Sequence, residues 1–202
     1  MNQCDRQLDR TLLILDLDET LIYATETPLE RSPDFCVFGY NVYRRPYLAE
    51  FLVRVLSEFD VAVWSSASDD YVAAVVSNIF GDHQDLRFVW GRSRATLRRN
   101  LQNDDGYFCD PWDHTHYIKP LTKVRRRGWR LDRVLIVDDT PEKCVRNYGN
   151  AIHPHPYSGE SGDMELKLLS LYLSSLKDEP NVRRIEKRRW RDEVKASVAG
   201  ND

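Results

Sequence analysis

Several features that would assign this chain to a class at once are missing from it. Its four cysteines, Cys4, Cys36, Cys109 and Cys144, are scattered and include no Cys-x-x-Cys pair. This pattern argues against a disulfide-stapled scaffold and favours a reducing cytosol. No stretch approaches the roughly 20 apolar residues of a membrane-spanning helix, and the N-terminus shows no signal-peptide pattern. We therefore expect a cytoplasmic protein without a membrane partner, or a nuclear one if the source is eukaryotic.

An excess of positive charge is also missing. The chain has 29 Lys and Arg against 32 Asp and Glu, a net charge of −3, which argues against a protein built wholly for nucleic acid. Positive charge does gather in two segments, 123–130 and 183–195, each with one tryptophan. Such a composition can bind nucleic acid or an acidic phosphopeptide. Given the overall negative charge, we favour a solvated helix face and a docking tail.

The most informative stretch present is Leu12–Leu21. Four apolar residues precede Asp16 and Asp18, which are separated only by Leu17, and such a run is typical of a buried parallel strand. Because successive side chains of a strand point to opposite faces, we expect both aspartates on one side and Leu17 in the core. Taken alone, these ten residues fit equally well a strand followed by an acidic helix N-cap.

The position of the two aspartates predicts a ligand site. Open α/β sheets bind ligands at the carboxyl ends of their strands. Two close carboxylates repel each other unless a cation or a shared proton lies between them. Because carboxylate oxygens are hard ligands, Mg²⁺ is the natural cation, with a phosphate completing its shell.

The order of elements along the chain predicts an α/β fold, a Rossmann-like parallel β-sheet flanked by helices. We expect its strands at 12–17, 60–64, 86–90, 133–137 and 151–152, and its helices from 46, over 69–80 and over 163–176. Residues 22–44 read as a β-hairpin flap over the aspartates, and residues 91–118 as an irregular insertion before the fourth strand. No segment is long enough for a large cap domain.

These elements divide the chain into three parts. We expect a lead-in at 1–10, one domain at 11–180, and a basic C-terminal tail at 181–202 that can dock through Val182, Ile185 and Trp190.

Further polar residues stand at strand ends or in an adjoining loop. Ser65, after the second strand, offers a hydroxyl and backbone N–H groups for phosphate oxygens. Lys119 offers a point charge to balance phosphate and carboxylates. Asp138 and Asp139, after the fourth strand, can complete a metal site. Together with Asp16 and Asp18, these residues predict a pocket with one hydroxyl, one ammonium group and four carboxylates.

The motifs that contain these residues resemble those of a known family. Residues 16–22, 44–48, 64–68 and 134–141, with Lys119, are similar to the haloacid-dehalogenase-like (HAD) phosphatases, and within them to the NIF-type phosphatases. Those share their catalytic module with the phosphatases of the RNA polymerase II C-terminal domain. The resemblance covers roughly residues 11–180 and implies the HAD fold.

The resemblance also implies roles for the acidic residues. Asp16 is expected to be the nucleophile that forms an aspartyl-phosphate, and Asp18 the general acid and base. Mg²⁺ is expected to be held by Asp16, the backbone carbonyl of Asp18, and the pair Asp138 and Asp139. Which residue of that pair touches the metal directly is left open.

The remaining implied roles concern substrate binding. Ser65 and Lys119 are expected to bind phosphoryl oxygens and stabilise charge in the transition state, with Ser66 in the same motif. Thr20 is expected to position Asp18 and the following loop. Arg92 matches an arginine that the family carries near the substrate, although an ordinary surface arginine is an equally good interpretation.

The function implied is a Mg²⁺-dependent phosphomonoesterase for phosphoserine or phosphothreonine in a phosphorylated protein or peptide. The alternatives are a small-molecule phosphatase, a nucleic-acid 3′-phosphatase, and a non-catalytic binding module on the same fold. A zinc site is disfavoured because its spacing fits no standard finger; its candidate ligands are Cys109, Asp110, Asp113, His114 and His116. The sequence gives no indication of oligomeric state.

Overall fold

Five parallel strands form the central sheet of the computed structural model, which describes residues 10–81, 86–99 and 115–199. The strands stand in the order β10-β9-β1-β5-β6. Their bounds are β1 Leu12–Leu15, β5 Asp60–Trp64, β6 Val89–Trp90, β9 Val134–Val137 and β10 Ala151–Ile152. All four residues of β1 and of β9 are buried, as expected of strands covered on both faces. The predicted parallel sheet is confirmed.

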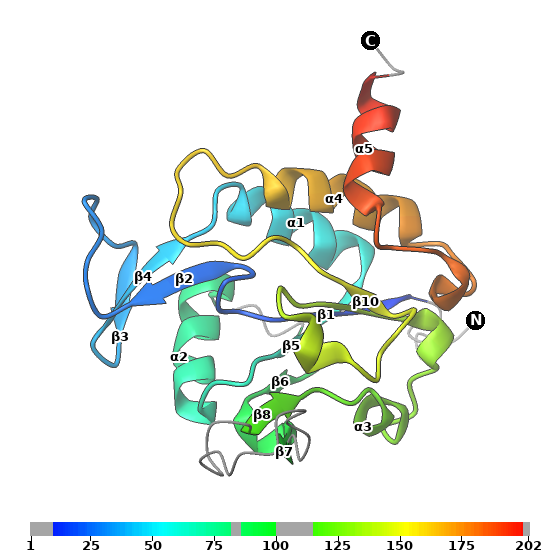
Figure 1. Ribbon diagram of the computed structural model, residues 1–202, viewed down its shortest axis with the longest axis horizontal. Coiled ribbons are helices and arrows are strands. Elements are labelled where there is room, and N and C mark those ends of the chain that lie inside the picture. The colour runs from blue at the N-terminus through cyan, green and yellow to red at the C-terminus, as the bar shows by residue number, and fades with distance from the viewer. Residues whose placement is uncertain (1–9, 82–85, 100–114, 200–202) are drawn as a thin grey trace, which may run out of the picture.

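The side chains of β1 alternate between the two faces of this sheet and so contribute to two separate hydrophobic clusters. Leu13 and Leu15 pack on the side of three helices, α1 (Leu48–Glu58), α2 (Asp69–Phe80) and α4 (Glu165–Leu176). Leu12 and Ile14 pack on the other side, where the short helix α3 (Thr122–Arg125) contributes Val124. Figure 1 shows α1 and α4 above the strands and α3 below them. Each predicted helix is therefore present, and α2 has the predicted bounds.

The segment after β1 forms a three-stranded antiparallel sheet rather than a two-stranded hairpin. Its order is β2-β4-β3, with β2 at Ile22–Thr25, β3 at Phe35–Val37 and β4 at Tyr40–Arg44. The hairpin formed by β3 and β4 matches the prediction, whereas β2 was missed. Ile22 is fully buried and Ala24 packs against the main core, so tertiary contacts stabilise a strand with little local signal.

The insertion is more regular than expected. It contains the single turn η2 (Arg92–Arg94) and an antiparallel ribbon of β7 (Thr96–Arg99) and β8 (Thr115–Ile118). The prediction of an irregular segment was therefore wrong for these residues. Residues 100–114, with four of the five disfavoured zinc ligands, lie outside the described ranges. The fifth, His116, lies in β8.

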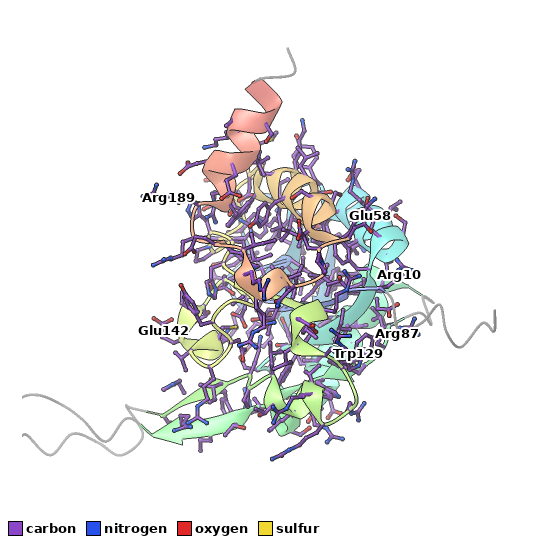
Figure 2. The ribbon with its side chains drawn as sticks, turned by 90° about the vertical axis from the view of Figure 1, so that its right-hand side faces the viewer. Arg10, Glu58, Arg87, Trp129, Glu142 and Arg189 are labelled. Atoms are coloured by element: carbon purple, nitrogen blue, oxygen red, sulfur yellow. The ribbon has the colours of Figure 1, made fainter. Side chains whose placement is uncertain are left out.

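The C-terminal segment packs against the domain. Val182 in the turn η5 (Val182–Arg184), and Trp190 and Val194 in α5 (Trp190–Ala199), belong to the main hydrophobic core. Lys187 donates hydrogen bonds to the carbonyl oxygens of Gly149, Val182 and Ile185. Figure 2 shows Arg189 at the foot of α5, which extends from the body of the protein. The remaining short turns are η3 (Leu131–Arg133) and η4 (Pro141–Cys144). Within the described ranges, no helix combines the length and apolar character needed to cross a membrane.

Candidate active site

Three predicted carboxylates meet where β1 and β9 end. The two strands pair in parallel, with Leu15 opposite Val137, and the backbone N–H of Asp16 donates to the carbonyl of Val137 at 2.9 Å. This register places Asp16 beside Asp138 and Asp139. One carboxylate oxygen from each of the three lies within 4.8 Å of the others, and all three side chains are buried. Residues some 120 positions apart in sequence thus form one acidic cluster.

Two lysines neutralise this cluster. The Nζ atom of Lys119 lies 2.8 Å from Asp16 Oδ2 and 2.6 Å from Asp138 Oδ2, and its side chain is fully buried. Lys143, in η4, places its Nζ 3.1 Å from Asp16 Oδ2 and 3.8 Å from Asp138 Oδ1. Lys119 was predicted, but Lys143 was missed. Its signal was its place in the turn directly after the acidic pair, where a neutralising cation is expected.

The charges in this cluster depend on one another. Burial raises the pKa of Asp16, but Lys119 and Lys143 outweigh it, so this pKa is lowered overall. Burial and the charge of Asp16 together raise the pKa of Asp138. Burial opposes the charge of Lys119, yet the two neighbouring carboxylates raise its pKa. Asp16 is therefore ionised at neutral pH, as a nucleophile or metal ligand requires.

Asp18 is not one of the three clustered carboxylates, although the charges of Asp16 and Lys143 act on it. Its Oδ1 accepts a hydrogen bond of 2.6 Å from the hydroxyl of Tyr71 in α2. Burial raises the pKa of Asp18, and although Tyr71 opposes this effect, the pKa is raised overall. Leu17 is fully buried between the two aspartates, as predicted. Instead of the predicted pocket of four carboxylates, three carboxylates form the cluster and Asp18 lies outside it.

Thr20 contacts Asp139 rather than Asp18. Its hydroxyl donates to Asp139 Oδ1 at 3.1 Å and accepts from the Asp139 backbone N–H at 3.2 Å. Thr140 also donates to Asp139, through its Oγ1 to Oδ2 at 3.0 Å. These contacts fix the orientation of the Asp139 carboxylate.

The serines after β5 lie in a tight turn. Ser65 is 1% exposed, and its Oγ accepts a hydrogen bond of 3.0 Å from the backbone N–H of Ala67. The backbone carbonyl of Ser66 accepts a hydrogen bond of 2.9 Å from Arg92 Nε. The Arg92 guanidinium also stacks on the Tyr117 ring, 5.4 Å from its centroid. Arg92 is thus held at the rim by two contacts.

An open cavity of about 530 Å³ adjoins Asp18. Its lining includes Phe38 and Tyr40 from the hairpin of β3 and β4, together with Tyr71 and Arg92. Phe38 is 68% exposed, although it is a large apolar side chain. A molecule in this cavity would contact apolar surface, one guanidinium group and the carboxyl groups of Asp18 and Asp70.

The parallel α/β sheet, with an acidic cluster at its carboxyl edge, defines an HAD-like fold. The chain belongs to the NLI interacting factor-like phosphatase family, whose family model matches residues 11–183. The family that the sequence motifs resemble is thereby confirmed.

Curated relatives carry names of the same kind. "Carboxy-terminal domain RNA polymerase II polypeptide A small phosphatase 1" of Homo sapiens is 27% identical over 175 residues, covering 83% of this chain and 60% of that protein. "CTD small phosphatase-like protein 2" of Dictyostelium discoideum is 28% identical over 178 residues, covering 85% of this chain and 28% of that protein. The chain therefore corresponds to only part of these relatives.

Solved structures support the fold. "The Structure of Fcp1, an essential RNA polymerase II CTD phosphatase" matches with a TM-score of 0.54 at 18% identity, covering 96% of this chain and 64% of that chain. An uncharacterized protein from Listeria monocytogenes serotype 4b matches with a TM-score of 0.50 at 19% identity, covering 82% of this chain and 98% of that chain. At this level of identity the likeness concerns the fold alone.

Proposed function

We propose that this chain is a Mg²⁺-dependent phosphomonoesterase that removes phosphate from phosphoserine or phosphothreonine in proteins. The main support is the buried cluster of Asp16, Asp138 and Asp139, neutralised by two lysines, with an open cavity at the neighbouring Asp18. Membership of a phosphatase family supports the same reaction class. Its location would be the cytoplasm or the nucleus.

In the first step a carboxylate oxygen of Asp16 attacks phosphorus. A bond forms between that oxygen and phosphorus, and the bond from phosphorus to the ester oxygen breaks. Asp18 gives its proton to the leaving oxygen, a role that suits a carboxyl group whose pKa is raised. Ser65 and the two lysines bind the phosphoryl oxygens and stabilise their developing charge, while Arg92 and the turn at Ser66 contact the substrate at the rim.

In the second step water attacks the phosphorus of the aspartyl-phosphate. Asp18, now a carboxylate, takes a proton from that water. The bond between phosphorus and the Asp16 oxygen breaks, which releases inorganic phosphate and restores both aspartates. Asp18 therefore acts first as acid and then as base, from one position against Tyr71.

The acidic cluster fits a magnesium ion. Asp16, Asp138 and Asp139 offer oxygen atoms only, close enough to one another to share one ion. The backbone carbonyl of Asp18 is the proposed fourth protein ligand. When bound, Mg²⁺ supplies positive charge that polarises the phosphoryl group and orients it. Thr20 holds the Asp139 carboxylate in place for this purpose.

The cavity beside Asp18 favours a polypeptide substrate. Exposed Phe38 and half-exposed Tyr40 offer apolar contacts next to the proposed acid, which residues flanking a phosphorylated side chain can occupy. A small phosphorylated metabolite would leave most of this apolar surface exposed to water. The names of the curated relatives point to protein substrates as well.

The first test is hydrolysis of p-nitrophenyl phosphate by the purified protein, with and without Mg²⁺, beside Asp16→Asn. We expect turnover that requires Mg²⁺ and falls by at least about 10³-fold in the variant, because the nucleophile is lost. Circular dichroism of both proteins controls for folding. A folded wild-type protein with no turnover under any divalent metal would overturn the proposal.

Lys143→Gln is expected to lower kcat by about 100-fold, because removing one group that stabilises the developing charge lowers kcat by about 100–1000-fold. Lys143 retains partial exposure, with 22% of its side chain accessible, so the variant should fold. Steady-state kinetics would measure the loss. Lys177→Gln, which removes an ion pair to Glu58, is the matched control. Equal kinetics for both variants would exclude Lys143 from the reaction.

A further inference from the structure

A second cavity, of about 320 Å³, is lined in part by Ser93 and Arg94 of the turn η2. Among the described residues it is lined by Trp90, Ser93, Arg94, Lys123, Arg126 and Arg127, of which four are cationic and none is acidic. Ser93 adds no free donor, because its hydroxyl already donates to Asp69. The lining is therefore that of an anion site.

The positive charge in this cavity is not neutralised by the described part of the chain. Within it, no salt bridge involves Arg94, Arg126 or Arg127, and Lys123 Nζ donates only to the carbonyl oxygens of Arg94 and Ala95. Partial burial, and then Arg94 and Arg126, lower the pKa of Lys123. These cations repel one another, and a bound anion would relieve that repulsion.

The other basic segment provides a contrast. Near α5, Arg188 pairs with Glu186 at 2.6 Å, and Arg191 pairs with Glu165. In segment 123–130, Arg130 likewise pairs with Asp132 at 2.6 Å. Lys123, Arg126 and Arg127, which line the cavity, have no carboxylate partner among the described residues.

The arginines of this cavity are partly held in place. The guanidinium groups of Arg94 and Arg127 lie 5.8 and 5.0 Å from the centroid of the Trp90 ring. Trp90 is itself fixed by stacking on Phe88 at 4.1 Å and by an edge contact with Trp64 at 5.0 Å. Such restraint reduces the entropy lost when an anion binds.

We propose that this cavity binds a second phosphate group of a multiply phosphorylated polypeptide substrate. The proposal rests on the proposed phosphatase function. The three-residue turn η2 joins the two sites, since Arg92 lines the cavity beside Asp18 and Arg94 lines this one. One extended peptide can therefore place one phosphate at Asp16 and another among the arginines, which bind phosphate in a fixed geometry.

Nucleic acid fits these observations less well. Binding of single strands uses exposed aromatic faces on which bases stack, but Trp90 is only 6% exposed and is covered by side chains. The cationic groups surround one compact cavity rather than follow a long groove.

The test is a binding titration of fluorescently labelled peptides, followed by polarisation, with Asp16→Asn as the parent protein so that no turnover occurs. One peptide carries a single phosphoserine. The others carry a second phosphoserine two, three, four, five or six residues away on either side. The parent is compared with the same protein carrying Arg94→Gln, Arg126→Gln and Arg127→Gln. Arg125→Gln is the control, because Arg125 is exposed and directly precedes Arg126 and Arg127 in sequence but does not line the cavity.

We expect the second phosphate to tighten binding by on the order of tenfold at a restricted set of spacings, the effect of about one charge-assisted hydrogen bond. The triple variant should lose this gain and Arg125→Gln should retain it. Equal affinity for singly and doubly phosphorylated peptides at every spacing would overturn the proposal. So would an equal loss in Arg125→Gln, or tighter binding of a single-stranded oligonucleotide of matched charge through the same arginines.

Turnover of p-nitrophenyl phosphate by the wild-type protein separates this proposal from the one on which it rests. A spacing-dependent gain without turnover would retain the anion site and overturn the phosphatase function. Turnover without any gain in affinity from a second phosphate would retain the phosphatase function and overturn the anion site.

Discussion

Replacing Lys119 by methionine is expected to abolish turnover and to lower the free energy of unfolding of the metal-free protein by about 3 kcal/mol. Lys119 is fully buried and lies within 2.8 Å of two buried carboxylates. Methionine fills a similar volume but leaves Asp16 and Asp138 with Lys143 alone. Because Lys143 compensates in part, we expect the lower end of the usual cost of breaking a buried pair, which is about 3–5 kcal/mol.

Urea unfolding followed by circular dichroism would measure this cost. Lys177→Met is the control: it removes a partly exposed ion pair to Glu58, and such pairs contribute about 0–1 kcal/mol. Saturating Mg²⁺ should narrow the stability difference between Lys119→Met and wild type, because the cation replaces the lost positive charge. Equal destabilisation by the two substitutions would contradict the role assigned to Lys119.

Replacing Arg45 by methionine is the second change with a large expected effect, a loss of about 3 kcal/mol. The buried guanidinium donates to both carboxylate oxygens of Asp163 at 3.0 and 2.8 Å. It also donates to three backbone carbonyls, those of Glu19, Thr20 and His155. The turn at 19–20 follows Asp18, so the loss of these contacts should lower kcat as well. Arg45→Lys should recover only part of the loss, because an ammonium group cannot reproduce the planar fork.

The pH dependence of the destabilisation by Arg45→Met follows from the ionisation of Asp163. Burial raises the pKa of Asp163, but the hydrogen bonds from Arg45 outweigh it, and the pKa is lowered overall. A carboxyl group with a lowered folded-state pKa contributes stability above its unfolded value of about 3.9, and this contribution is lost as the pH falls through the folded-state pKa. The destabilisation by Arg45→Met should therefore be complete at pH 7 and shrink below about pH 4.

Thermal unfolding of wild type and variant across this pH range would check the prediction. Arg44→Met is the neighbouring control, because Arg44 is exposed and its guanidinium donates to one carbonyl, that of Asn78. We expect a change within about 0.5 kcal/mol for this surface position. A constant destabilisation by Arg45→Met from pH 7 to pH 3 would show that the pair with Asp163 contributes little.

The sequence predicted those parts of the fold that have strong local signals. The apolar runs at Leu12–Leu15 and Val134–Val137 are long enough, and acidic enough at their ends, to mark both central strands. Helix α2 has a regular apolar face that ends at Gly81. In contrast, β2 and the ribbon of β7 and β8 have no clear alternation, and their strand state depends on partners distant in sequence.

The candidate site was predictable to a similar degree. Motif spacing located Asp16 and Asp138, because parallel strands bring their carboxyl ends together. Lys119, which follows β8 of the antiparallel ribbon, was located through its family motif. Motif spacing did not reveal Tyr71, which reaches Asp18 through a side-chain direction that no spacing encodes, and the position of Lys143 after the acidic pair was not used. For the same reason the sequence did not reveal that the Thr20 hydroxyl contacts Asp139.

The strand order has a consequence for how this chain is made. The first strand of the sheet is the central one, and its neighbour β9 follows roughly 120 residues later. At a synthesis rate of about 5–20 residues per second, about 6–24 s separate the synthesis of β1 from that of β9. During that interval an apolar strand with an unpaired edge is present on the nascent chain. Chaperone demand should therefore be greatest midway through translation, and the acidic cluster can form only after that period ends.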